Sequence, residues 1–95
     1  SLPFVATLAL AGTAEDFITI PVGFRGRKIS MVNEGPGIAF LKNDATALAT
    51  AASIKVFPKD AYAEEGLNVT TKWSFIGETG KQPRIRGVVW AAPVL

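Results

Sequence analysis

Alternation of apolar and polar side chains is the dominant pattern along this chain, and it has the two-residue period of a β-strand. In residues 27–43 the apolar positions alternate on both sides of Asn33–Gly37, as Ile29 and Met31 illustrate for the first half. Asn33–Gly37 contains two glycines, which accept positive φ, and one proline, whose φ is fixed near about −65°. We therefore predict a central hairpin, in which two strands are joined by a tight turn.

The same period recurs along the rest of the chain, in short segments separated by turns rich in proline and glycine. No segment has a convincing helical period. The predicted strands are Phe4–Leu10, Asp16–Ile20, Phe24–Met31, Ile38–Leu41, Ser53–Phe57, Ala61–Leu67, Val69–Ile76 and Arg84–Trp90. About eight short strands predict an all-β fold in a single domain, residues 1–95.

The alanine-rich segment 43–52 separates the fourth and fifth predicted strands and is expected to be a long loop that crosses the sandwich. A crossing loop at this place favours a jelly-roll-like β-sandwich, and an immunoglobulin-like sandwich is the alternative. Ala61–Leu67 is the weakest predicted strand and is expected at a sheet edge. Gly87 lies between Ile85 and Val89 in the last strand, where a facing backbone or an aromatic ring is expected to approach closely.

Composition favours self-association. The chain has only 95 residues, 48% of them hydrophobic, and it has no cysteine that could form a stabilising disulfide. Its first strand is apolar on both faces, so we expect one face to pack against another molecule. The expected contact arms are the apolar chain ends, namely Leu2, Phe4, Leu8 and Leu10 at the start and Val94 and Leu95 at the end.

The last strand is the second candidate contact surface. Arg84, Arg86 and Trp90 share one of its faces, and arginine with tryptophan is typical of interface anchors. The same residue types also form stacking platforms for single-stranded nucleic acid or sugars. A binding module for carbohydrate or nucleic acid that uses Trp73, Trp90 or Tyr62 is therefore the competing hypothesis.

Catalytic chemistry is not indicated, and no enzyme activity, cofactor or metal is expected. Histidine is absent, which removes the commonest general base and metal ligand. Glu64 and Glu65 are adjacent, so on a strand they point to opposite faces and cannot act as a pair. Asp16, Asp44 and Asp60 lie beside turns, where carboxylates usually cap backbone amides. A hydrolase that works through carboxylates alone is the remaining enzymatic alternative.

Neither a membrane nor nucleic acid is an expected partner. The first apolar run lacks a basic flank and contains Pro3, so it is a poor signal peptide, and no run is long enough to span a bilayer. The net charge is +2, with ten basic residues scattered among eight acidic ones. A soluble protein that is not exported is expected.

The order of strands and turns resembles that of small β-sandwich virion proteins of tailed bacteriophages. In these proteins a strand ending in Pro-x-Gly leads to a strand ending in Asn-x-Gly, and then to an aromatic strand with an alanine and threonine loop. The matching segments here are Thr13–Gly23, Ile29–Gly35, Ile38–Ala47, Phe57–Asp60 and Ser74–Gly77. The charged segment Phe24–Lys28 and the aromatic last strands depart from the simplest form of this pattern.

The resemblance implies a capsid decoration or cement protein, or else a tail or head-completion component. It further implies a homotrimer that contacts the major capsid protein or another shell protein. Such a protein would be made in the host cytoplasm and would end on the capsid surface of the virion.

Overall fold

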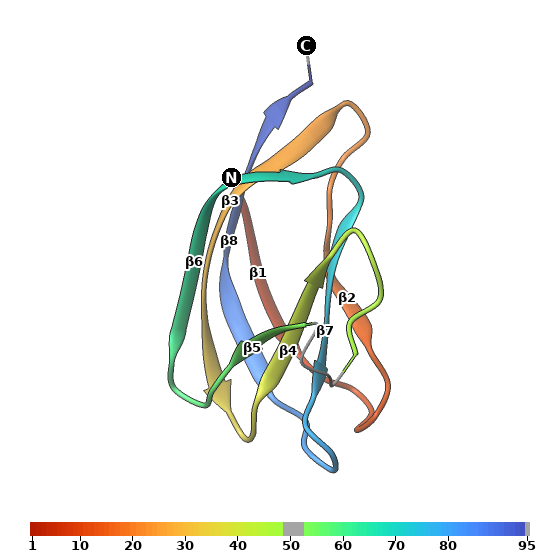
Figure 1. The fold of residues 1–95 in the computed structure, drawn as a ribbon, viewed down its shortest axis with the longest axis vertical. Helices are drawn as coiled ribbons and strands as arrows, with labels where there is room; N and C mark the ends of the chain where they lie inside the picture. Colours follow the sequence, from red (N-terminus) through yellow and green to blue (C-terminus); the bar gives the residue numbers. More distant parts are fainter. Residues whose placement is uncertain (49–52, 95) are drawn as a thin grey trace.

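The structure, a computed structural model, describes residues 1–48 and 53–94 and has eight strands in that part of the chain (Figure 1). Burial alternates along the first, third and last strands, as the apolar periodicity predicts. The bounds of the eight strands are β1 Leu2–Thr7, β2 Glu15–Thr19, β3 Phe24–Gly35, β4 Ala39–Asn43, β5 Ile54–Val56, β6 Ala61–Val69, β7 Lys72–Gly77 and β8 Arg84–Pro93.

The strands form two antiparallel sheets that pack face to face as a sandwich. Sheet A has the order β1-β8-β3-β6, and sheet B has the order β2-β7-β4-β5. The first strand pairs with the last, β2 with β7, β3 with β6, and β4 with β5. One long antiparallel hairpin rolled into two layers gives this pairing, which is the jelly-roll topology. The all-β sandwich is confirmed, and its order differs from the immunoglobulin fold, where the first two strands share a sheet.

The predicted central hairpin is wrong. β3 belongs to sheet A and β4 to sheet B, so the turn between them carries the chain from one layer to the other. Gly35 and Gly37 do adopt positive φ, 81° and 83°, as the turn requires. Alternation shows which residues of a strand share a face, but it contains no information on which strand lies next to it.

The core lies between the sheets and contains most of the large apolar side chains. Trp73 and Phe75 of β7 are fully buried, and Ile29, Ile85 and Val89 face them from sheet A. Aromatic rings link the layers, because the Phe17 ring lies 4.6 Å from that of Phe4 and 5.7 Å from that of Phe75. Burial of these side chains is the main favourable term in folding.

Neighbouring strands of sheet A approach closely at Gly87, as predicted for the last strand. Gly87 is paired with Met31 of β3 and with Phe4 of β1. A Cβ atom at Gly87 would lie only 2.7 Å from the Met31 Cα atom. The facing group is therefore backbone, and only glycine fits at this position.

The outer faces of the two sheets differ. On sheet B, Phe40, Ser74 and Ile76 point away from the core and are nevertheless buried. The segment after β4 folds back onto this face, where the Ala47 N–H donates to Ser74 Oγ at 2.7 Å. The predicted long loop covers sheet B in its described part, but the prediction that it crosses the sandwich is wrong, because β4 and β5 are neighbours in the same sheet. Residues 49–52 of that prediction lie outside the described residues. No described segment covers the outer face of sheet A in this way.

Candidate interaction surface

The three β8 residues singled out from the sequence share the outer face of sheet A. Arg84, Arg86 and Trp90 alternate with the buried Ile85 and Val89, as the strand period requires. All three are exposed, Trp90 to 40%. Whether this face contacts another molecule is a separate question from where its residues lie.

Glu34 joins the two arginines into one cluster. Its Oε1 accepts from Arg84 Nε at 3.0 Å, and its Oε2 lies 3.0 Å from Arg86 Nη2. The two-residue period of β3 places Glu34 on the outer face with Val32, which is paired with Arg86. The sequence analysis missed Glu34 because it assigned this residue to a turn, whereas β3 continues to Gly35. We call Glu34, Arg84 and Arg86 the arginine end of the face.

Asn33 fixes the backbone beside Glu34. Its fully buried side chain donates to the carbonyls of Gly37 and Val56, both at 2.9 Å, and accepts from the Gly35 N–H at 2.8 Å. These bonds tie the end of β3 to the turn that follows it and to β5. The Asn-x-Gly sequence was the signal for a turn, and its asparagine is the residue that holds this turn in place.

A second polar cluster lies at the other end of the face. Lys28 Nζ is 4.9 Å from the centroid of the Trp90 ring and 3.3 Å from Glu65 Oε1. The three residues are direct cross-strand neighbours on β8, β3 and β6. We call Trp90, Lys28 and Glu65 the tryptophan end.

Apolar and small side chains occupy the middle of the face. One row across the strands contains Val5, Val32 and Ala61, with Arg86 of the arginine end between Val5 and Val32. The next row contains Pro3, Val88, Ser30 and Ala63. Val5 is 57% exposed. The sequence contained a signal for this patch, because the first strand is apolar on both faces, but residues on three other strands complete it.

The N-terminal contact arm needs correction. Phe4 and Leu8 are buried in the core of the same chain, so neither is available to a partner. The Leu8 N–H donates to the Pro83 carbonyl at 3.0 Å, which fixes the segment after β1 against the start of β8. The apolar side chains on one face of the first strand are buried by the core of the same chain, so that face does not require a partner. Leu2 is half-buried beside the core, and Leu10 is 65% exposed in the turn after β1.

The C-terminal arm lies at one tip of the sandwich and not on the outer face of sheet A. The Val94 N–H donates to the Gly23 carbonyl at 2.8 Å, next to the exposed Val22 and Phe24. Val94 is 49% exposed. Leu95, the other predicted residue of this arm, lies outside the described residues. The tip and the outer face of sheet A are thus two separate apolar surfaces.

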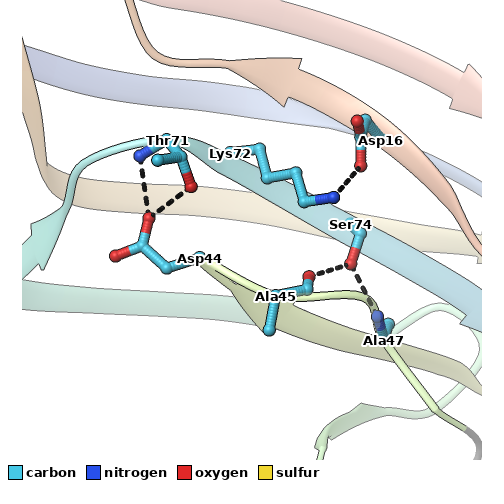
Figure 2. Close-up of polar contacts among 7 residues, drawn as sticks. All are labelled: Asp16, Asp44, Ala45, Ala47, Thr71, Lys72 and Ser74. Atoms are coloured by element: carbon cyan, nitrogen blue, oxygen red, sulfur yellow. Dashed lines mark hydrogen bonds and ion pairs between the residues drawn. The ribbon is translucent and has the colours of Figure 1, made fainter.

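The three aspartates examined for chemistry have structural contacts. Asp44 Oδ1 accepts from the backbone N–H group of Thr71 at 2.8 Å (Figure 2). It also accepts from the backbone N–H group of Thr70 at 2.9 Å. Burial acts to raise the pKa of Asp44, but these hydrogen bonds outweigh it and lower the pKa below its ordinary value of 3.8. Asp16 pairs with Lys72 at 3.4 Å. Asp44 is the amide cap that its position beside a turn predicts.

Asp60 contributes its backbone carbonyl, which accepts from the Asn33 N–H at 3.0 Å. Within residues 1–48 and 53–94, no three carboxylates come together in a way that could hold a metal ion, and no pocket is present. The same part of the chain contains no helix of the length and apolar character needed to cross a membrane.

The aromatic residues proposed as a stacking platform do not share a surface. Trp73 is fully buried in the core. Tyr62 is partly buried, and its burial, together with the nearby Glu64 carboxylate, raises its pKa to about 12. Trp90 alone is exposed, with Lys28 over its ring. A platform built from all three is excluded.

Comparison with known protein families, with curated proteins and with solved structures finds no match to this chain. The resemblance to phage virion proteins therefore remains one of strand and turn order.

Proposed function

We propose that this protein is a structural component of a virus particle, which decorates or cements a bacteriophage capsid. It self-associates and contacts the major capsid protein or another shell protein at the capsid surface. The observation that carries the proposal is the uncovered outer face of sheet A, where arginine, tryptophan and aliphatic side chains lie together. Arginine and tryptophan are enriched at the centres of protein interfaces, where the buried surface is also more apolar than elsewhere.

The jelly-roll topology is compatible with this class of protein. Jelly-roll sandwiches occur in viral capsid proteins, but also in lectins and cupins. The order of turns and strands, given above, favours the virion class among these. Each copy would cover a seam between shell proteins with a modest contact, and many copies on one shell would add through multivalency.

Electron microscopy with immunogold labelling tests the proposal. Antibodies raised against the purified chain are applied to virus particles from lysates of the organism that encodes it, with pre-immune serum as the control. Gold on the heads is the expected result. Gold confined to the tail or to the neck would indicate a tail or head-completion component. Particles without gold, from a lysate in which the antibody detects the protein, would contradict the proposal.

The competing function is a module that binds carbohydrate or nucleic acid through Trp90, which lies on the same face as Arg86. Titration with glycans and with single-stranded oligonucleotides, followed by tryptophan fluorescence, separates the two. A decoration protein should give no saturable change, because Trp73 is buried and the exposed Trp90 would bind neither glycan nor oligonucleotide. A saturable change that disappears in Trp90→Ala would support the binding module.

A further inference from the structure

The edges of the two sheets are poorly suited to joining copies of this chain. β6 has Glu64 and Glu65 in the middle of its length, and β1 contains Pro3, which has no N–H to donate. β5 has only three residues, and the ladder of β2 shifts register after Asp16. Charges, proline, short strands and bulges are the usual means of preventing edge pairing. Association through a face is therefore favoured over strand addition.

The outer face of sheet A has two chemically different ends. At the arginine end, two arginines share Glu34, which leaves an excess of one positive charge. At the tryptophan end, Lys28 and Glu65 balance each other beside an exposed aromatic ring. Arg84 and Trp90 are six positions apart along β8, and the apolar rows lie between the two ends.

This polarity selects one way of laying two such faces together. A two-fold axis parallel to the strands would place the arginine end on the arginine end of the second copy, where like charges repel. A two-fold axis in the interface and perpendicular to the strands places the arginine end on the tryptophan end. Arg84 then faces Trp90 of the second copy, Glu34 faces its Lys28, and the apolar rows face each other.

We propose that a second copy of this chain occupies the outer face of sheet A, related by that two-fold axis. The inference deepens the proposed function, because it assigns a surface to the self-association on which that function rests. It predicts a pair of copies, in place of the three that the resemblance implies.

The size of the face indicates a weak pair. Four strands about 4.8 Å apart and six residues of about 3.4 Å give roughly 20 Å by 20 Å, or about 400 Å² of flat area per copy. Interfaces that bury less than about 1,200 Å² in total are usually transient. The pair should therefore dissociate on dilution.

Sedimentation equilibrium of the purified chain tests the proposal across roughly 5 μM to 1 mM, where weak complexes dissociate. The mass should rise from 10.0 kDa towards twice that value. Val5→Glu places a charge in the apolar rows and should keep the mass at one copy throughout. Val22→Glu is the matched control, since Val22 is fully exposed at the tip, and it should associate like the unmodified chain. Val88→Glu repeats the test if Val5→Glu does not fold.

A mass of one copy at every concentration would overturn the proposal, and so would a three-copy mass that Val5→Glu leaves unchanged. Neither result affects the immunogold experiment, so failure of the pair and failure of the capsid function are distinguishable.

A double-mutant cycle tests the two-fold axis itself. Lys28 and Glu34 are six residues apart on β3, too far to interact within one chain. Lys28→Ala and Glu34→Ala should each weaken the pair several-fold, and the double variant should be little weaker than the weaker single variant. The changes that the two substitutions cause in the free energy of unfolding should add in the double variant. If the fold-changes of the two single variants in the dimer dissociation constant simply multiply in the double variant, this axis is excluded.

Discussion

Removal of the Asn33 side chain should destabilise the fold more than any other loss of a single polar side chain. Asn33→Ala deletes three hydrogen bonds, to Gly37, Val56 and Gly35, from a fully buried position. At about 1–1.5 kcal/mol for each of the three neutral bonds, the expected cost is about 3–4.5 kcal/mol. A chain of this length has a total stability of roughly 5–14 kcal/mol, so the variant should fold only marginally.

Urea unfolding followed by tryptophan fluorescence measures this cost, because Trp73 lies in the core. Asn68→Ala is the matched control, since its side chain has one exposed contact, 3.4 Å from Arg25 Nη1, and it should cost less than about 0.5 kcal/mol. If Asn33→Ala lost no more stability than Asn68→Ala, the turn after β3 would not depend on the buried amide, and the placement of Glu34 would need another cause.

Three further predictions concern other parts of the fold. Because the pKa of Asp44 is lowered in the folded chain, this carboxylate stabilises the fold above its ordinary pKa, and the stabilisation is lost as the pH falls through the lowered value. Asp44→Asn keeps an acceptor for the two N–H groups but does not titrate, so the free energy of unfolding should depend less on pH below about 4. Asp44→Ala removes the acceptor and should cost about 1–2 kcal/mol. An unchanged acid profile in Asp44→Asn would exclude this carboxylate as the cause. Gly87→Ala should cost about 3 kcal/mol or more in urea unfolding, because its Cβ would meet the β3 backbone, and a loss below about 1 kcal/mol would show that the strands can separate there. Tyr62 is the sole tyrosine, so titration of the tyrosine absorbance should give its pKa directly, near 12 in the unmodified chain and lower in Glu64→Gln. The stability that the neutral phenol contributes should be lost as the pH rises from about 10 through this value. Ionisation near pH 10 in the folded chain would contradict the burial of Tyr62.

Local alternation was sufficient to predict the strands and much of what each strand buries. Trp73 and Phe75 share the inner face, as their spacing requires, and Arg84, Arg86 and Trp90 share an outer face. These relations depend only on the two-residue period, which any strand obeys. The close backbone approach at Gly87 followed from the missing side chain between two buried neighbours.

Relations between strands were not predictable in the same way. The Asn33–Gly37 turn has the composition of a hairpin, yet it connects the two sheets. Phe4 and Leu8 belong to an apolar segment that needs cover, but the sequence does not tell whether its own core or a partner supplies it. The Glu34 cluster depends on the pairing of β3 with β8, which brings Glu34 to Arg84 and Arg86 and which alternation does not specify.

Small-angle X-ray scattering of the concentrated protein tests most directly whether copies meet through the outer face of sheet A. One copy measures 42 × 22 × 21 Å. Face-to-face pairing roughly doubles a short dimension, so the largest dimension should be about 60 Å or less at a mass of two copies. A particle of the same mass that extends to about 80 Å would place the contact at the Val22, Phe24 and Val94 tip, and would contradict the account.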